Sequence, residues 1–314
     1  MIPRKEIIII FVVILGILFT VPFYASGYIV SLLVTILMYS ILASSWNFLS
    51  GYTGYVSLGS AAFVGIGAYV TVACWHLIPL PLIIVFAGLA SMVFAALVGS
   101  PCLRIRGPYF VILTFGLAEA VKFIVQQFLV RISANENILV GAPPPEIFFY
   151  SLLAIFAIVI IMDHVIRNSK FGLGLISIRG NEEAAEAMGV NTTNYKLFAF
   201  MISALFMGMV GVVMALRWTY IITNTAFNAS ISFQIMIMAV LGGSKDFRGP
   251  LVGAIVLTII SEAFGSTFPY FYMILLGLVL IIIVKFVPKG IMGLLGDRSF
   301  SKLLDKMARA ESKK

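Results

Sequence analysis

The chain has 314 residues, of which 61% are hydrophobic and only 11% are charged, and its mean hydropathy is +1.09. Soluble domains carry roughly a quarter charged residues, and a soluble protein this apolar would expose too much apolar surface to stay dispersed. The formal net charge of +8 comes largely from seven basic residues between Lys289 and Lys314. Because that stretch is short and follows an apolar segment, it is typical of a cytoplasmic tail rather than of a nucleic-acid-binding region.

The composition therefore predicts an all-α polytopic membrane protein with about ten transmembrane helices, each needing about 20 apolar residues. The first segment follows Arg4 and Lys5 and resembles a secretory signal, but an uncleaved span is favoured because a second span follows directly. The eighth segment has a short apolar core that ends at Gly242, so we expect it to tilt, break or re-enter. The predicted spans are residues 7–24, 28–49, 56–75, 78–100, 108–130, 148–166, 197–217, 231–243, 250–266 and 270–287.

The placement of Lys and Arg predicts the orientation of these spans. With the N-terminus inside, the inside regions hold 17 basic residues and the outside ends hold two, Arg131 and Arg217. Both termini are then cytoplasmic, which requires an even number of spans. Residues 1–288 form the transmembrane domain, with a cytoplasmic loop at 167–196, and residues 289–314 form a basic cytoplasmic tail.

The cytoplasmic loop contains the longest strongly polar stretch of the chain, SIRGNEEAAEAMGVNTTNYK, from Ser177 to Lys196. Asn181 is a good N-cap, and two glutamates follow in the first helical turn, where the helix dipole favours acids. Gly189 is a plausible helix stop, and Asn191 or Thr192 can cap the next span. The sequence predicts a short helix at the cytoplasmic face, which is either a solvated connector or a specific docking element.

The spacing in this stretch resembles a known motif. Glu183-Ala184-Ala185, followed after three residues by Gly189, is similar to the EAA---G pattern of binding-protein-dependent ABC permeases, although the Ile-x-Leu-Pro that continues the pattern is missing. Four ordered blocks together resemble the LivM-type permeases of branched-chain amino acid ABC importers, over most of residues 30–290. They are SWNFLSGYTGYVSLGSAAFVGIGAYV (45–70), LRIRGPYFVILTFGLAEAVKF (103–123), SIRGNEEAAEAMGVNTTNYKLFAFMISALFMGMVGVVMA (177–215) and LGGSKDFRGPLVGAIV (241–256).

The resemblance implies a fold similar to the vitamin B12-type importer permeases, in a prokaryotic inner membrane. It implies a second, LivH-like permease, two ATPase subunits of LivG and LivF type, and an extracytoplasmic substrate-binding protein. The implied function is import of leucine, isoleucine and valine, or within the same class of urea, short amides or other amino acids. The implied ATPase-coupling residues are Glu182, Glu183, Ala184, Ala185, Glu186 and Gly189.

The sequence holds no phosphate-binding loop, since GGSKDFRG lacks the required glycine spacing. We therefore expect no catalytic residue, no metal site and no cofactor in this chain, with ATP and Mg²⁺ used by the partner ATPase subunits. An intramembrane enzyme is disfavoured because the sequence shows no recognisable nucleophile or acid–base arrangement.

Three charged residues, Glu119, Lys122 and Glu262, fall inside predicted spans. A charge at that depth costs about 3 kcal/mol on insertion scales and is a functional candidate. Glu119 and Lys122 are three residues apart and can neutralise each other on one helix face, so they are either a structural pair or part of the translocation path. An ion-coupled secondary transporter would use such acids, but it would leave the EAA-type loop without a purpose. Asp163 and His164 are expected at the membrane interface.

Small residues cluster in the second and third predicted spans. The glycines at 51, 54, 59, 65 and 67 indicate close helix packing, or a broken segment near 51–57 that lines the pathway. Cys74 and Cys102 are expected to be packing residues. Arg-Gly-Pro opens both 105–120 and 247–263, and the match reflects either a parallel repeat or shared helix-start chemistry.

Overall fold

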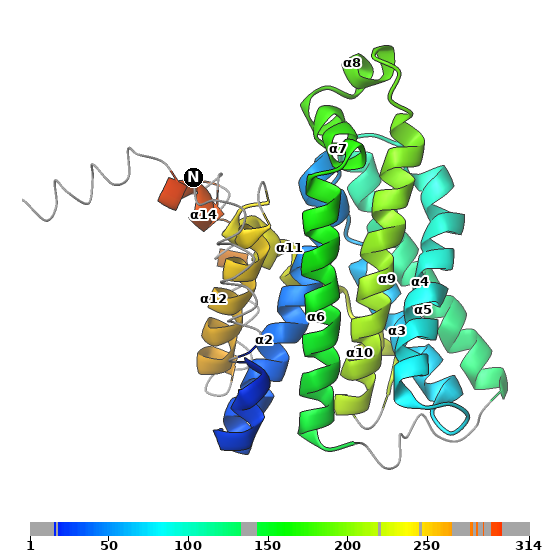
Figure 1. Ribbon diagram of the computed structural model, residues 1–314. Coiled ribbons are helices and arrows are strands. Elements are labelled where there is room, and N and C mark those ends of the chain that lie inside the picture. Colours follow the sequence, from blue (N-terminus) through cyan, green and yellow to red (C-terminus); the bar gives the residue numbers. More distant parts are fainter. Residues whose placement is uncertain are drawn as a thin grey trace, which may run out of the picture.

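The computed structural model describes residues 16, 18–132, 143–218, 221–244, 247–265, 277–278, 281, 285 and 290–296. Within these ranges every regular element is a helix (Figure 1). The helices are α2 (Gly27–Trp46), the π-helix η1 (Asn47–Gly51), α3 (Ser60–Cys74), α4 (Leu80–Cys102), α5 (Pro108–Ile132), α6 (Pro145–Arg167), α7 (Lys170–Gly180), α8 (Glu182–Ala187), α9 (Thr192–Trp218), α10 (Thr223–Ala226), α11 (Ala229–Gly242), α12 (Arg248–Gly265) and α14 (Gly290–Gly296).

Six described helical segments are long and apolar enough to cross a membrane, which confirms the all-helical membrane class. They are Gly27–Gly51, Leu80–Cys102, Pro108–Gln127, Pro145–Arg167, Thr192–Trp218 and Thr223–Gly242. The predicted spans at 56–75 and 250–266 coincide with α3, a shorter apolar helix, and with α12. The predicted span at 7–24 is described only at residues 16 and 18–24, which are helical, and most of 270–287 and of the tail lies outside the described residues, so the total of ten spans stays a prediction.

Proline and asparagine mark where several helices begin. α5 and α6 start at proline, and α4 carries one in its first two positions, where the missing N–H costs no intrahelical hydrogen bond. The weak eighth segment is preceded by a break: the single turn α10 ends before Asn228, whose side chain accepts a hydrogen bond from Ser230 N at 2.9 Å and starts α11. α11 then ends at Gly242, and the next residue, Gly243, has φ at +105°.

α9 is the central helix of the main bundle. It packs against α3, α4, α2 and α6, and Figure 1 shows α4, α6 and α9 side by side. A Cβ on Gly67 of α3 would lie 2.1 Å from the Gly208 carbonyl oxygen of α9, so the two backbones are in direct contact. The close-packing interpretation therefore holds for Gly67, because only glycine allows this approach.

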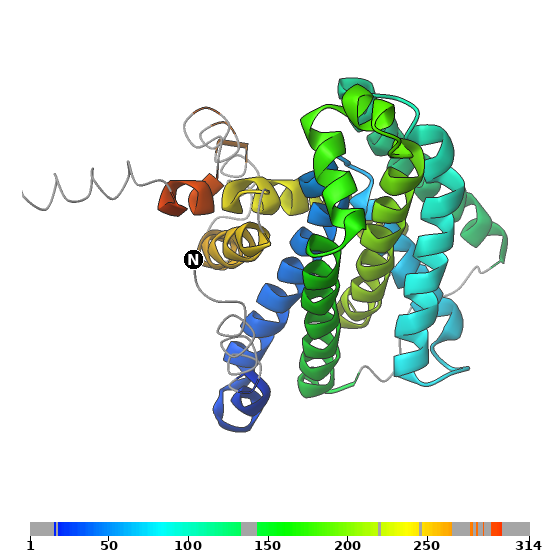
Figure 2. The ribbon, with the colours of Figure 1, turned by 45° about the horizontal axis from the view of Figure 1, so that its top comes forward.

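α2 separates the main bundle from a second group of helices. It contacts α6 and α9 on one side and α11 and α12 on the other (Figures 1 and 2). α7 and α8 lie beyond one end of the bundle, next to the N-terminal end of α9 (Figure 1). This end carries the loop 167–196, which the sequence predicts to be cytoplasmic.

The chain leaves helical geometry after residue 53, two residues beyond η1, and this confirms a break in the 51–57 region. Gly54 has φ at +79°, and no helix is present again until α3 begins at Ser60. Trp46 Nε1 donates to Ser57 O at 2.8 Å, and Leu58 N donates to Thr114 Oγ1 of α5 at 3.1 Å. Polar contacts from two helices thus fix the broken segment, which consists of residues 54–59. A π-helix beside such a break is common at functional sites.

Candidate functional site

The short helix α8 forms as the sequence predicts. Asn181 leaves helical geometry, with φ −159° and ψ 112°, and its Oδ1 accepts a hydrogen bond from Ala184 N at 3.1 Å. Glu182 and Glu183 occupy the first turn, where their charges oppose the positive end of the helix dipole. One asparagine therefore ends α7 and starts α8.

The C-terminal end of α8 is closed by a Schellman motif. Gly189 adopts φ +87°, its N donates to Glu186 O at 2.9 Å, and Val190 N donates to Ala185 O at 3.0 Å. These two bonds satisfy carbonyls that a helix end leaves open. Asn191 then caps α9, since its Oδ1 accepts from Asn194 N at 3.2 Å. α8 is a rigid unit held at both ends.

One face of α8 is buried and the other points to solvent. Ala185 is 4% exposed, whereas Met188 is 85% exposed and the Glu183 side chain is 83% exposed. Ala184 and Ala187 are exposed as well. The small side chains and the projecting methionine form an open surface at the end of the bundle, which we call the α8 face: Glu183, Ala184, Glu186, Ala187 and Met188.

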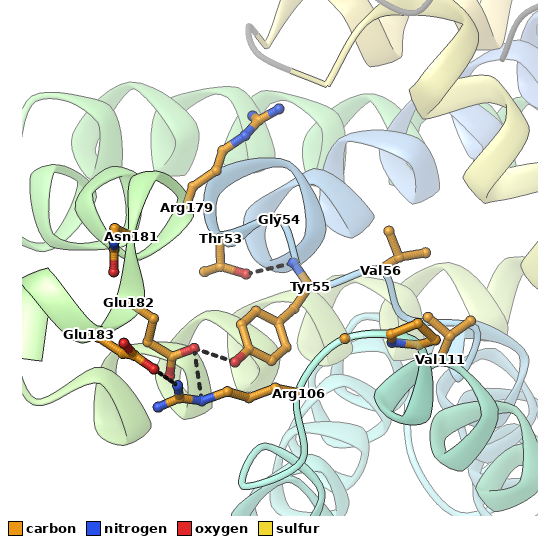
Figure 3. A pocket seen from close by; sticks show the side chains of 12 residues that line it. Thr53, Gly54, Tyr55, Val56, Arg106, Val111, Arg179, Asn181, Glu182 and Glu183 are labelled. Atoms are coloured by element: carbon orange, nitrogen blue, oxygen red, sulfur yellow. Dashed lines mark hydrogen bonds and ion pairs between the residues drawn. The ribbon is translucent and has the colours of Figure 1, made fainter. Parts of the chain in front are cut away.

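Glu182 does not belong to this open face. Its side chain is only 11% exposed and forms an ion pair at 2.6 Å with Nζ of Lys196, which is 2% exposed. Lys196 Nζ also donates to Leu103 O at 3.0 Å and to Tyr55 Oη at 3.2 Å, and lies 4.4 Å from the centre of the Tyr55 ring. Tyr55 Oη in turn donates to the Glu182 carboxylate, as Figure 3 shows.

The electrostatics of this cluster favour a charged Glu182. Burial alone would raise the pKa of its carboxyl. Hydrogen bonds from Lys196 and Tyr55, with the positive charges of Lys196 and Arg106, outweigh burial and lower that pKa below its ordinary value. Burial, together with the hydrogen bond to Glu182 and its negative charge, raises the pKa of the Tyr55 phenol well above its ordinary range, so the phenol stays protonated and donates.

Arg106 joins the start of α5 to all three acids of α8. Its guanidinium lies 3.6 Å from Glu182, 3.4 Å from Glu183 and 3.9 Å from Glu186, and its side chain is 50% exposed. Ion pairs at this exposure contribute little stability individually, so the arginine mainly orients the helix. A pocket of about 600 Å³ opens beside it (Figure 3), lined by Thr53, Gly54, Tyr55, Val56, Arg106, Gly107, Pro108, Val111, Arg179, Asn181, Glu182 and Glu183.

Arg179 links the α7–α8 unit to the break in the second span. Its Nη1 donates to Gly51 O at 2.5 Å, at the end of η1, and to Ser244 O at 3.4 Å, just past α11. Tyr55, in the broken segment, contacts Glu182 from the other side. The α7–α8 unit is thus hydrogen-bonded both to the end of η1 and to the broken segment 54–59.

The membrane-depth charges lie apart from this site. Glu119 and Lys122 form an ion pair at 3.1 Å on α5, which confirms that they can neutralise each other. Glu262 Oε1 accepts a hydrogen bond from Tyr28 Oη of α2 at 3.3 Å. Asp163 is buried within the protein at 5% exposure, where Tyr52 donates to its Oδ1 at 2.8 Å, and its place at the membrane interface stays a prediction.

The sequence did not reveal the inward partners of α8. In the sequence, Lys196 and Arg106 indicate only the orientation of the spans, and no local pattern marks Tyr55 or Arg179. One signal was available, since Lys196 stands within the first turns of an apolar helix, where an unpaired ammonium is costly. Among the described residues, no group of three or more His, Cys, Asp or Glu side chains is placed to hold a metal ion.

Comparison with known proteins identifies relatives along most of the chain. Residues 28–284 match the family described as branched-chain amino acid transport system / permease component. The chain is 26% identical to the permease protein LivM of the high-affinity branched-chain amino acid transport system of Salmonella typhimurium, and 25% identical to that of Escherichia coli. Each of these alignments covers 86% of this chain and 71% of the relative.

A more distant relative is a probable LivM of Methanocaldococcus jannaschii. It is 23% identical, and the alignment covers 81% of this chain and 90% of the relative. No solved structure matches this chain. The assignment therefore comes from the family match and from these relatives.

Proposed function

The chain belongs to the family of permease components of branched-chain amino acid transport systems and is of the LivM type, and we propose that it works within an ATP-driven importer whose ATPase subunits dock on α8. The observation that carries this proposal is the construction of α8. The helix is capped at both ends, has an open outer face and is anchored by a buried ion pair. Such a helix can transmit a displacement of a bound partner without unfolding.

The α8 face has the chemistry of a docking element. The alanines allow a partner groove to approach closely, Met188 offers a projecting apolar anchor, and Glu183 and Glu186 at the rim can meet basic residues across an interface. Glu182 has a different role, since it fastens the helix to Lys196 rather than to a partner. We propose two ATPase subunits of LivG and LivF type as the partners, with ATP and Mg²⁺ bound by them.

The contacts behind α8 support mechanical coupling to the membrane domain. Arg179 donates to Gly51 O and Ser244 O, and Tyr55 donates to Glu182. The broken segment thus sits between the docking helix and α3, and we propose that it moves when the ATPases close. A second, LivH-like permease completes the pathway in this proposal.

The proposed membrane arrangement has ten spans with both termini cytoplasmic, similar to the vitamin B12-type importer permeases. Six described membrane-capable helices, together with α3 and α12, support eight of these spans. The concentration of Lys and Arg near α8 and in the tail supports the orientation. The proposed location is the inner membrane of a prokaryotic cell.

The proposed substrates are leucine, isoleucine and valine, delivered by an extracytoplasmic binding protein. The names of the relatives support this class. Urea, short amides and other amino acids are the alternatives within the same machine. Ion-coupled transport is less well supported, since Glu119 is already paired with Lys122 and the capped α8 face would have no partner.

Reconstitution of the complex tests the proposal. The chain, its partner permease, the two ATPases and the binding protein are placed in liposomes, and uptake of labelled leucine and labelled urea is measured. The proposal expects leucine uptake that requires ATP on the ATPase side and is unaffected by collapse of ion gradients. Uptake of urea would show that the substrate belongs to the alternative class. Uptake of leucine driven by a proton or sodium gradient without ATP would refute the importer mechanism.

A further inference from the structure

A second pocket, of about 540 Å³, lies far from α8. It is formed between α2, the C-terminal end of α9, the α10–α11 break and α12. α9 has 27 residues and is therefore about 40 Å long, which places Arg217 at the opposite end of the bundle from the docking helix. The pocket is lined by Thr35, Met38, Tyr39, Met214, Arg217, Trp218, Thr225, Asn228, Ser230, Ile231, Gln234 and Glu262.

The pocket contains one cationic side chain, Arg217. Its Nη1 donates to Thr35 Oγ1 at 3.0 Å and its Nη2 donates to Ser31 Oγ at 3.4 Å. Both acceptors are neutral hydroxyls of α2, and these two bonds use two of the five guanidinium donors. The planar fork of an arginine matches a carboxylate in a bidentate manner. Arg217 is thus held in place by α2 and presents its charge to the pocket.

The pocket also contains one anionic side chain, Glu262 of α12. Tyr28 Oη donates to its Oε1 at 3.3 Å. Nearby, Tyr39 Oη donates to Gln234 Oε1 at 2.8 Å, and both of these side chains line the pocket. Glu262 and Arg217 are both exposed, so a small molecule can reach them. Ionisable residues at membrane depth in transporters commonly mark substrate pathways.

The remaining wall of the pocket is apolar. Met38, Met214 and Ile231 line it and are 5%, 5% and 7% exposed, respectively. Methionine adapts its shape to aliphatic groups of differing branching. A volume of about 540 Å³ falls within the usual range for small-molecule sites. The pocket therefore combines one positive group, one negative group and an adaptable apolar surface.

We propose that this pocket is a transit subsite that recognises the zwitterionic backbone of an aliphatic amino acid. The α-carboxylate pairs with Arg217, the α-ammonium pairs with Glu262, and the aliphatic side chain packs on Met38, Met214 and Ile231. The inference rests on the proposed function and adds to it that the permease itself selects for amino acids. In the proposed orientation the subsite lies on the extracytoplasmic side, where the binding protein releases its cargo.

Recognition of both charges predicts a specific chemical discrimination. An analogue that lacks the carboxylate cannot form the bidentate pair with Arg217, and one that lacks the amine cannot form the ion pair with Glu262. Each analogue therefore loses one of the two charge-assisted contacts that leucine makes. Isoamylamine and 4-methylpentanoate keep the leucine side chain and lack one charge each, so both are expected to bind much more weakly than leucine.

Photo-crosslinking of the assembled complex tests the subsite. The probe is a leucine analogue that carries a diazirine on its side chain, and labelled peptides are mapped by mass spectrometry. The proposal expects labelling at Met38, Met214 or Ile231 that excess leucine suppresses and that equal concentrations of isoamylamine or 4-methylpentanoate leave in place. Labelling confined to other segments, or equal competition by all three compounds, would overturn the proposal.

Variants separate recognition from folding. Arg217→Gln and Glu262→Gln are each expected to reduce leucine uptake by about tenfold, the effect of losing one charge-assisted hydrogen bond, while Arg217→Lys restores part of it. Glu146→Gln, an exposed acid outside the pocket, is the matched charge control and is expected to transport normally.

The outcomes also separate this inference from the proposed function. If wild-type complex imports leucine with ATP while Arg217→Gln and Glu262→Gln assemble and transport normally, the subsite is refuted and the importer stands. If the wild-type complex imports no amino acid, both the subsite and the proposed importer function are refuted. If a variant complex fails to assemble, the crosslinking competition on the wild-type complex decides the question, because it needs no substitution.

Discussion

The ion pair between Lys196 and Glu182 should be the main anchor of the docking helix. Replacing Lys196 by Met leaves the Glu182 carboxylate, 11% exposed, without its closest cation. Replacing Glu182 by Gln leaves an ammonium that is 2% exposed without a counter-charge. Each single variant should therefore destabilise the protein, whereas the double variant removes both charges together.

The size of the effect follows from the geometry. Two unit charges at 2.6 Å attract by about 6 kcal/mol at an effective dielectric constant of about 20. The desolvation of both groups offsets part of this attraction, and breaking a buried pair by removing one partner typically costs about 3–5 kcal/mol. For 314 residues, with an unfolding entropy of about 2.1 cal/mol/K per residue, a loss of about 3 kcal/mol in the free energy of unfolding lowers Tm by roughly 4–5 °C.

The assay is thermal unfolding of the purified chain in detergent, followed by size-exclusion of a fluorescent fusion. We expect K196M and E182Q to lose several degrees each, and the double variant to lose clearly less than the two combined. The exposed Arg106 gives a matched control, since R106M should shift Tm by no more than about 2 °C. Strictly additive losses, or a K196M variant with wild-type Tm, would refute the reasoning.

The lowered pKa of Glu182 adds a pH dependence to the same experiment. A carboxyl whose pKa is depressed by folding stabilises the protein fully above its ordinary value of 4.5, and this contribution is lost as pH falls through the lowered pKa. The Tm difference between wild type and E182Q should therefore stay constant from about pH 5 to pH 8 and shrink in stronger acid. A difference that grows on acidification would contradict the sign.

Three further predictions concern glycine and the membrane charges. Gly67→Ala should lower the free energy of unfolding by about 1–3 kcal/mol through overpacking, because the new Cβ would lie 2.1 Å from the Gly208 carbonyl oxygen. Gly116→Ala is the control: a Cβ there meets nothing within 4 Å, so thermal stability should not change. Gly189→Ala should lower the free energy of unfolding by about 1–2 kcal/mol, because alanine is strained at φ +87°. The variant should also co-purify with less ATPase while the membrane domain stays folded, and unchanged ATPase binding would contradict this. Glu119→Gln should slow leucine uptake severalfold without loss of assembly, and normal uptake would leave its pair with Lys122 a structural role only.

The local features of the docking helix could be predicted from the sequence because they depend on neighbours in the chain. Asn181 as N-cap, the acids of the first turn and Gly189 as helix stop require only short-range hydrogen bonds and backbone geometry. Apolar segments likewise predict helices, because a span must satisfy its own backbone. These parts of the account needed no tertiary information.

The inward contacts could not be predicted because they depend on packing between distant segments. Tyr55, Arg106 and Lys196 are separated by up to 141 positions, and nothing in the local pattern shows that their side chains converge on Glu182. The same limit applies to the pocket at Arg217 and Glu262, which the fold assembles from five helices. The motif located the docking helix, but only the structure distinguished its outer acids from its anchoring one.

Purification of the chain from its native membrane in mild detergent tests the central claim most directly. The account predicts that a second permease and ATPase subunits come with the chain, and that charge reversal of the outer acid in E183K combined with G189A removes the ATPases but not the second permease. The matched control is Glu146→Lys, on the other side of the proposed membrane. Recovery of the chain alone, with leucine uptake driven by an ion gradient, would contradict the account.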